Sequence, residues 1–269
     1  MKILIVVQAR TQSTRLPYKV MMSLCGKPLL ARIVERIDSA RFTNEIVIAT
    51  STASQDDVIE DLCRAENIEC FRGDPFDLLD RHYKAAIKYD ADAIVKIPSD
   101  CPLIDPEIID KVISVFINSN DEFDYVSNLH PASYPDGNDV EIMSFEALEK
   151  SWFEAKLPFE REHTTPYIWE NRNKFIVGNV EWENKLDYSS THRWTIDYEE
   201  DYIFIKKVYE ELYPEHKIFN MYQILKLLQD KPFLKKINQK YVGQYWYDNH
   251  IAELKNIKEY KRKKKMAVL

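Results

Sequence analysis

Short apolar runs alternate with amphipathic stretches through the first half of the chain, and this alternation constrains the fold more than any other feature. The apolar runs cover residues 3–7, 45–50 and 93–97, and their β-branched character suits buried strands. Apolar side chains between them recur at helical spacing, which predicts helices over residues 28–37, 56–66, 78–89 and 106–118, with one more short strand over residues 69–72. The alternation predicts an α/β protein with a mostly parallel, helix-covered sheet.

The second half of the chain departs from this rhythm. We expect strands over residues 125–128, 139–143, 175–182 and 193–197, and helices over residues 145–155, 161–171 and 200–212, the middle one interrupted by Pro166. No internal repeat and no linker rich in Gly, Pro or Ser divides the sequence. We therefore expect one α/β domain over residues 1–231, followed by an extension over residues 232–269 that ends in a basic tail.

The charge and the cysteines limit the classes of function. The net charge is −7, so a locally basic loop favours a small anionic ligand over nucleic acid as the partner. The four cysteines show no CxxC pairing and no metal-type spacing with histidine. The sequence enters its first strand without a secretory signal, and no apolar run approaches the length of a membrane span. We expect a cytoplasmic protein with reduced thiols and no membrane insertion.

The loop after the first strand carries the clearest binding signal. It reads QARTQSTRLPYKV and places Arg10, Arg15 and Lys19 among hydroxyl side chains. Guanidinium groups and hydroxyls match phosphate oxygens, so the loop suits a triphosphate. It is not a Walker loop, since it has no glycine and must bind through side chains. A solvated basic turn is the alternative, but open α/β sheets bind ligands at this end of their strands.

Asp100 ends the strand over residues 93–97 and is the first candidate for a metal ligand. Mg²⁺ prefers one or two carboxylates completed by phosphate oxygens and water, and Asp100 is expected in the same crevice as the loop. A loop-capping role is the alternative, and we expect Asp105 to be the N-cap of the helix that begins at Pro106. Asp197 is either a second metal ligand or the N-cap of the helix over residues 200–212.

Two other polar segments are candidates for a functional site. Asp139 and Glu141 alternate along an expected strand and so share a face. Arg161 and His163 lie in the block REHTT, where a charged helix face is an equally ordinary explanation.

Several motifs in order resemble one enzyme family. QARTQSTRLPYKV, GKPLL, FRGD, LLDRHY, SDCPLIDP, YPDGNDVE, REHTTPYI and RWTIDYEEDY follow one another between residues 1 and 212. Together they resemble the cytidylyltransferases of the SpsF type, from spore coat polysaccharide biosynthesis, which are similar to the enzymes that make CMP-sialic acid and CMP-Kdo. Agreement of many motifs in order is more specific than any one motif.

The resemblance implies a fold, a reaction and a set of site residues. It implies a GT-A-like, Rossmann-type α/β/α fold with a mostly parallel mixed sheet, and transfer of CMP from CTP to an acid sugar or other small acceptor with release of pyrophosphate. It implies a nucleotidyltransferase domain over residues 1–231, with Mg²⁺ on Asp100 and Asp197. The residues implied for catalysis are Arg10, Arg15, Lys19 and Asp100; those for CTP are Gln8, Ala9, Arg10, Ser13, Arg15, Lys19, Lys27, Arg72 and Ser99; those for the acceptor are Arg81, Asp139, Glu141, Arg161 and His163.

The sequence also departs from the family pattern. Gln12 and Tyr18 stand where relatives keep glycine, which changes how closely phosphate can approach the backbone. A GT-A glycosyltransferase is one rival interpretation, although the sequence SDCPLID lacks a DxD motif. A non-catalytic nucleotide-binding scaffold subunit is the other. The aromatic segment over residues 241–247 is expected to close the active site, to form the contact of a homodimer, or to be buried against the domain.

Overall fold

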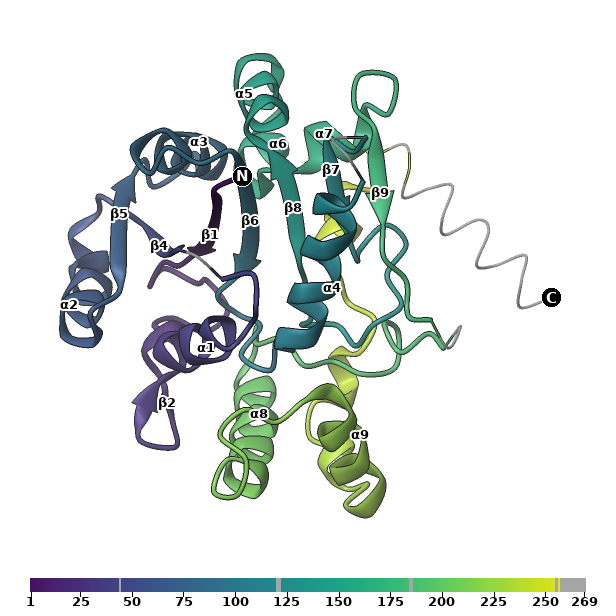
Figure 1. The fold of residues 1–269 in the computed structure, drawn as a ribbon. Helices are drawn as coiled ribbons and strands as arrows, with labels where there is room; N and C mark the ends of the chain where they lie inside the picture. The colour runs from purple at the N-terminus through teal and green to yellow at the C-terminus, as the bar shows by residue number, and fades with distance from the viewer. Residues whose placement is uncertain (44, 120–121, 184–185, 255, 257–269) are drawn as a thin grey trace.

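Seven strands form one mixed sheet in the computed structural model, which describes residues 1–43, 45–119, 122–183, 186–254 and 256. The strand order is β5-β4-β1-β6-β8-β7-β9 (Figure 1). β1, β4, β5 and β6 run parallel, whereas β8 is antiparallel to both β6 and β7. The strand bounds are β1 Ile3–Gln8, β4 Glu45–Ser51, β5 Glu69–Gly73, β6 Ala93–Pro98, β7 Tyr125–Ser127, β8 Glu141–Ser144 and β9 Val177–Asn179. This arrangement confirms the predicted α/β fold class.

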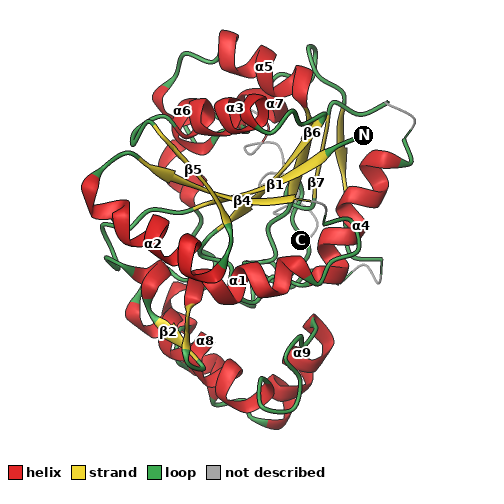
Figure 2. Cartoon of the chain, turned by 60° about the vertical axis from the view of Figure 1, so that its left-hand side comes forward, coloured by secondary structure: helices red, strands yellow, loops and turns green. Residues whose placement is uncertain are grey.

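Helices cover both faces of the sheet and make three layers (Figure 2). One face carries α3 (Leu78–Lys88), α5 (Phe145–Glu154), α6 (Pro158–His163) and α7 (Pro166–Glu170). The other carries α1 (Leu29–Asp38), α2 (Asp57–Glu66) and α4 (Pro106–Ile117), beyond which lie α8 (Glu199–Leu212) and α9 (Met221–Asp230).

The central strand β1 supplies side chains to both hydrophobic cores. Ile3, Ile5 and Val7 are buried with the residues of α1, α2, α4, α8 and α9. Leu4 and Val6 are buried with the residues of α3, α5 and α7. Because successive side chains of a strand point to opposite faces, a strand buried on both faces must be apolar at every position. This requirement explains the uninterrupted apolar run at the start of the chain.

Side-chain caps fix the starts of several helices. The Asp105 carboxylate accepts from the Glu107 N–H at 2.9 Å ahead of Pro106, which confirms the predicted cap. Asp77 caps α3 and Ser144 caps α5 in the same way. Each cap fixes the residue at which the loop from the preceding strand ends and the helix begins.

The second half contains the differences from the predicted elements. The predicted strand over residues 193–197 is wrong: only an isolated bridge joins Arg193 to Asp136, and Ile196 bonds instead to the loop at Asp100. The segment therefore makes backbone hydrogen bonds to two different loops, at Asp136 and at Asp100, instead of pairing along one strand. The predicted helix over residues 161–171 is two helices, because Thr164 between them has a positive φ of 71°. The predicted strand over residues 175–182 shortens to β9.

Two features have no counterpart in the predicted elements. A small hairpin, β2 (Ser23–Leu24) with β3 (Lys27–Pro28), follows the binding loop. The helix α9 lies in a stretch for which no helix is predicted, and its N-cap Asn220 accepts from the Gln223 N–H at 3.1 Å.

The segment after α9 packs on the domain. Leu234 is buried in the first core, and Leu254 is fully buried in the second core, beside residues of α3, α5 and α7. The Asn238 amide donates to the Arg193 carbonyl, and the Asn256 amide donates to the Trp169 carbonyl. The predicted basic tail from Lys258 to Lys265 lies outside the described residues.

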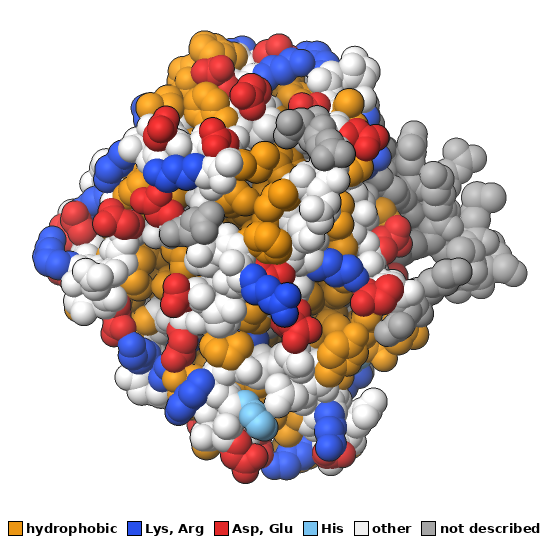
Figure 3. Space-filling view, in the orientation of Figure 1, with side chains coloured by type: hydrophobic (Ala, Val, Ile, Leu, Met, Phe, Trp, Pro, Cys, Tyr) orange, Lys and Arg blue, Asp and Glu red, His pale blue; other side chains and the backbone are white. Residues whose placement is uncertain are grey.

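The surface mixes charges of both signs. Acidic and basic side chains are interspersed over the face shown in Figure 3, and Arg64 with Asp61 is one of several ion pairs between exposed groups of the protein. Within the part of the chain that the structure describes, each helix is too short or too polar to cross a membrane.

We expect Leu254→Ala to lower the free energy of unfolding by about 2–4 kcal/mol, because it leaves a cavity in a packed core. Urea denaturation followed by circular dichroism measures the change. Ile203→Ala is the control: Ile203 is 40% exposed on α8, so the loss there should stay within about 0.5 kcal/mol. Equal losses for the two variants would contradict the packing of the terminal segment.

Candidate functional site

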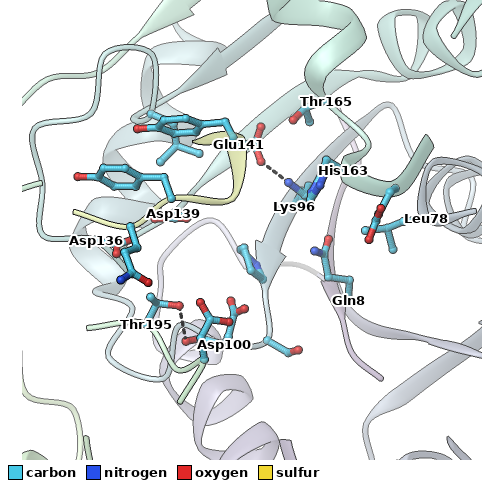
Figure 4. A pocket seen from close by; sticks show the side chains of 18 of the residues that line it. Gln8, Leu78, Lys96, Asp100, Asp136, Asp139, Glu141, His163, Thr165 and Thr195 are labelled. Atoms are coloured by element: carbon cyan, nitrogen blue, oxygen red, sulfur yellow. Dashed lines mark hydrogen bonds and ion pairs between the residues drawn. The ribbon is translucent and has the colours of Figure 1, made fainter. Parts of the chain in front are cut away.

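A cavity of about 730 Å³ opens at the carboxyl ends of β1 and β6. β1 lies between β4 and β6, so the chain order reverses at this point of the sheet. Ligands bind open α/β sheets at such switch points. The walls come from the ends of β1 and β6, the loop after β1, the loops around β7 and β8, and residues 244–250 near the end of the chain (Figure 4).

A buried aspartate anchors the loop that follows β1. The Asp56 carboxylate accepts from the Thr11 backbone N–H at 2.7 Å and from the Thr11 hydroxyl at 2.8 Å. Its other oxygen accepts from the Ser51 hydroxyl at the end of β4. Thr11 and Asp56 are each 1% exposed. The loop is therefore fixed to the neighbouring strand at its base, while the cations that follow remain available to the cavity.

Lys19 joins the loop to two carboxylates. Its Nζ lies 3.1 Å from Asp100 Oδ2 and 3.3 Å from Asp197 Oδ1, and it also donates to the Ile196 carbonyl. Burial by itself would lower the pKa of Lys19, but Asp100 and Asp197 outweigh it and raise that pKa above its ordinary value. The ammonium group is therefore charged at any physiological pH.

Asp197 is the meeting point of three cations. Arg15 Nη2 lies 2.6 Å from Asp197 Oδ1, and Arg193 Nη2 lies 2.9 Å from Asp197 Oδ2. Burial favours a higher pKa, but Lys19, Arg15 and Arg193 together hold the pKa of Asp197 below its usual range. The predicted alternative of an N-cap is wrong, because Tyr198 is the N-cap residue of α8, and Asp201 accepts from the backbone N–H groups of Asp197 and Tyr198. The Asp197 carboxylate is left to the cavity.

The donor set of Asp100 and Asp197 fits Mg²⁺. Both carboxylates lie within reach of the same Lys19 Nζ, so they converge on one region of the cavity. The described residues contain no group of three His, Cys, Asp or Glu side chains arranged to hold a metal. A bound Mg²⁺ would take its remaining ligands from phosphate oxygens and water, as this ion ordinarily does.

A second pair of carboxylates, Asp136 and Asp139, lies further along the wall (Figure 4). Burial, and then the charge of Asp100, raise the pKa of Asp139 to about 6. Burial and the nearby Asp139 also raise the pKa of Asp136, although Arg193 Nη1 lies 3.4 Å away. Gly137 between them is required, because a Cβ there would lie 2.6 Å from the backbone of Trp194.

The part of the cavity wall formed by Lys96 and Glu141 carries no net charge, because these two side chains pair with each other. Lys96 on β6 faces Glu141 on β8 across the sheet, and the two form a buried ion pair. The Tyr125 hydroxyl donates to the same carboxylate at 2.6 Å. His163 lies near this pair (Figure 4), and burial together with Lys96 lowers its pKa to about 3. His163 is therefore a neutral imidazole at physiological pH.

The structure brings most of the predicted site residues into this one cavity. Those that line it are Gln8, Ala9, Arg10, Ser13, Arg15, Lys19, Arg81, Ser99, Asp100, Asp139, Glu141, His163 and Asp197. Their individual roles stay predictions.

Three of the predicted residues lie outside the cavity. Lys27 lies on β3 of the β2–β3 hairpin, outside the cavity, and pairs with Glu66. Arg72 turns to the first turns of α2, where Asp57 and Glu60 hold it. Arg161 pairs with Asp77, the cap of α3. In this structure each of these three side chains pairs with a carboxylate outside the cavity, and their binding roles stay predictions.

Part of the aromatic segment over residues 241–247 belongs to the cavity wall. Tyr245 and Tyr247 line the cavity, and their rings stack with centroids 5.0 Å apart. The Tyr245 hydroxyl donates to the Ser189 carbonyl at 2.7 Å, and Arg193 Nη1 donates to the Gln244 carbonyl. Tyr245 and Tyr247 thus pack against the domain and form part of the cavity wall, and the roles of this segment in closing the site and in a homodimer stay predictions.

The two departures from the family glycines have different structural effects. Tyr18 has a φ of 59°, in the left-handed region that favours glycine, and its side chain is 48% exposed. Gln12 has no such backbone conformation; its amide donates to Gln55 Oε1 at 3.1 Å, and it does not line the cavity.

Comparisons with known proteins agree with this geometry. A family profile described as cytidylyltransferase matches residues 4–265. An uncharacterized protein of Methanocaldococcus jannaschii is 38% identical over 88% of this chain and 95% of its own length. The spore coat polysaccharide biosynthesis protein SpsF of Bacillus subtilis is 31% identical over 78% of this chain and 87% of its own.

Two solved structures are similar in fold. A cytidylyltransferase from Leptospira borgpetersenii serovar Hardjo-bovis has a TM-score of 0.83 and 32% identity over 92% of this chain and 99% of its own. A CMP:2-keto-3-deoxy-manno-octonic acid synthetase complexed with CTP has a TM-score of 0.61 and 16% identity over 78% of this chain and 99% of its own. The second likeness shows the fold alone.

We expect Tyr18→Gly to be at least as stable as the wild type. The substitution relieves a left-handed conformation that costs an ordinary residue about 1 kcal/mol, which offsets the added flexibility of glycine. Tyr222→Gly is the matched control, because Tyr222 is 50% exposed but helical, and it should lose about 1 kcal/mol. Thermal melts compare the two, and a Tyr18→Gly loss as large as that of the control would contradict the assignment of strain.

The raised pKa of Asp139 makes a prediction about pH. The native state binds this proton more tightly than the unfolded chain, whose Asp pKa is about 3.9, so the contribution is full below about pH 4 and is lost as the pH rises through about 6. We expect Asp139→Asn to stabilise the metal-free protein at neutral pH by about 1–2 kcal/mol relative to wild type, with a smaller difference near pH 4. Urea denaturation in chelator measures it.

Asp61→Asn is the control for this pH experiment, since Asp61 is an exposed residue of α2. A constant difference between Asp139→Asn and wild type across the whole pH range would rule out the raised pKa.

Proposed function

The chain belongs to the cytidylyltransferase family, and we propose that it transfers CMP from CTP to an acid sugar or another small acceptor, releasing pyrophosphate. The match to the family covers nearly the whole chain, so the proposal concerns its substrates and not its class. The similarity to SpsF supports a place in the synthesis of a surface polysaccharide or glycoconjugate. The resemblance of its motifs to the enzymes that make CMP-sialic acid and CMP-Kdo supports an acid sugar as acceptor.

The observation that best supports this proposal is the position of Lys19, whose ion pairs join the cationic loop after β1 to Asp100 and Asp197 in one cavity. A triphosphate needs cations for its oxygens, and Mg²⁺ needs carboxylates beside those oxygens. The cations Arg15 and Lys19 and the carboxylates Asp100 and Asp197 lie within contact distance of one another in the cavity. A binding module for a neutral ligand would have no use for such a cluster.

In the proposed reaction an acceptor oxygen attacks the α-phosphorus of CTP and the bond to the β-phosphate oxygen breaks, so pyrophosphate leaves. Such a reaction depends on positioning and on neutralising charge. Arg10, Arg15 and Lys19 would bind the β- and γ-phosphates and balance the charge that develops on the leaving group. Mg²⁺ held by Asp100 and Asp197 would supply polarisation of the α-phosphate.

The proton of the acceptor hydroxyl needs a destination. Asp139 lines the cavity and has a pKa near 6, which suits a group that accepts a proton at neutral pH. His163 is a weaker base, because burial lowers its pKa to about 3. We assign Asp139 to this role, together with a part in binding the acceptor.

We expect Asp100→Ala to lower Mg²⁺-dependent release of pyrophosphate from CTP by at least about 10³-fold, because the metal loses one of its two protein ligands. A coupled pyrophosphate assay with a panel of sugar acids measures turnover. Asp230→Asn, at the exposed end of α9, is the control and should retain wild-type turnover. Unchanged turnover of Asp100→Ala would show that the metal site is assigned wrongly.

The same assay separates the proposal from its rivals. Thermal shifts with each of the four nucleoside triphosphates and Mg²⁺ establish whether CTP is preferred. Release of UDP or GDP from nucleotide sugars would instead favour a glycosyltransferase. Binding of CTP without turnover of any acceptor in the panel would favour a scaffold subunit.

A further inference from the structure

Arg193, in the irregular segment before α8, is a buried arginine with a partner for each of its donors. It is 3% exposed. The N–H groups of a guanidinium lie in one plane and point in fixed directions. Nε and Nη2 donate to the two oxygens of Asp201 at 3.0 and 3.1 Å, and Nη2 also donates to Asp197 at 2.9 Å. Nη1 donates to Asp136 at 3.4 Å and to the Gln244 carbonyl at 3.3 Å.

The carboxylates around Arg193 lie in two different places. Asp201 is fully buried at the start of α8, and its paired contact with Nε and Nη2 fixes the plane of the guanidinium. Asp136 and Asp197 line the cavity. One planar group therefore connects a carboxylate of the interior to two carboxylates of the cavity wall.

The two oxygens of Asp197 have different kinds of partner. Oδ1 is contacted by Arg15 at 2.6 Å and by Lys19 at 3.3 Å, both of which would bind phosphates in the proposed reaction. Oδ2 accepts from Arg193 at 2.9 Å. A bound triphosphate can draw Arg15 and Lys19 away from Asp197, whereas Arg193 is held by the buried Asp201. Arg193 is therefore the partner that keeps Asp197 oriented when a nucleotide is bound.

The segment after α9 holds Arg193 from outside the cavity. The Asn238 amide donates to the Arg193 carbonyl and to Asp201 Oδ1, both at 2.9 Å, and Asn238 is 3% exposed. Asn238 does not line the cavity, so it acts on the cavity wall through Arg193 and Asp201. The contacts of Arg193 with Asn238 and Gln244 span 45 and 51 residues of sequence. They form only when the segment after α9 has packed on the domain.

We propose that Arg193 is a positioning residue for a divalent-cation site at Asp197, and that the segment after α9 keeps Arg193 in place through Asn238. The part that concerns the cation rests on the proposed function, in which Asp197 binds Mg²⁺. Arg193 holds Oδ2 of Asp197 and leaves Oδ1 for the cation. Loss of a side chain that orients a metal ligand in this way weakens metal binding or activity by roughly 10- to 100-fold.

Two variants test this inference without changing the charge of the site. Arg193→Lys keeps the cation but loses the planar group, and Asn238→Ala removes an amide that lies outside the cavity. Asn220→Ala is the matched control, because it removes an amide that caps α9 away from the cavity. Removal of a charge would change the affinity for a cation by electrostatics alone. These three substitutions therefore report on the orientation of Asp197.

Titration of the full chain with Mn²⁺ and no nucleotide, followed by electron paramagnetic resonance, measures the affinity of the site. We expect the Mn²⁺ affinity to fall roughly 10-fold in Arg193→Lys and roughly threefold in Asn238→Ala, and to stay within about twofold of wild type in Asn220→Ala. The Mg²⁺ concentration that gives half-maximal release of pyrophosphate from CTP should rise by the same factors. Turnover of Asn238→Ala at saturating Mg²⁺ should stay within about threefold of wild type, since its carboxylates remain.

The outcomes separate this inference from the proposed function. Wild-type Mn²⁺ affinity in Arg193→Lys would overturn the inference, while CTP turnover still decides the function. A wild-type protein that binds Mn²⁺ more tightly than both variants but transfers no CMP would overturn the function and support the inference. No Mn²⁺ binding by wild type would overturn the cation site and the inference with it. Should Arg193→Lys fail to fold, Asn238→Ala decides, and an affinity equal to that of Asn220→Ala would overturn the inference.

Discussion

The ammonium group of Lys19 is the interaction on which the site depends. It connects three segments that are far apart in sequence: the loop after β1, the end of β6 at Asp100, and the irregular segment at Asp197. A buried amine between two carboxylates is stable only because each charge is balanced by another within about 4 Å. The same arrangement holds the pKa of Asp197 below its usual range and keeps both carboxylates at the cavity wall. Binding of a triphosphate and a divalent cation would therefore exchange partners within a cluster that is already charged and already placed.

The sequence predicted the fold well where one physical rule decides the structure. Strands buried on both faces must be apolar throughout, and β1, β4 and β6 are recognisable for that reason. The cap at Asp105 was also predictable, and so was the convergence of Arg15, Lys19 and Asp100, because the carboxyl ends of neighbouring parallel strands meet at one edge. Asp197 joins them from an irregular segment that the sequence pattern predicted as a strand. The chain's alternation of strand and helix therefore supplied the architecture and the place of the site.

What the sequence could not supply depends on contacts between distant segments. The segment over residues 193–197 has the composition of a strand, yet its backbone bonds to Asp136 and Asp100. Lys27 and Arg72 carry the same charge as Lys19, and only the hairpin and the acidic start of α2 show that they are occupied elsewhere. Tyr245 and Tyr247 belong to an aromatic segment for which the sequence left three roles open. No local pattern reveals that this segment returns to the cavity at the carboxyl ends of β1 and β6.

That return of the chain has a consequence for how the protein is made. The cavity wall runs from Gln8 to His250, so the loop after β1 has all its neighbours only after residue 250 has been synthesised. On the ribosome, the sheet and its helices can form while the last segment is still being synthesised. The cavity then lacks the part of its wall that Tyr245 and Tyr247 supply until that segment has packed. Packing late in synthesis, with contacts of very long sequence separation, makes this step slow relative to helix formation.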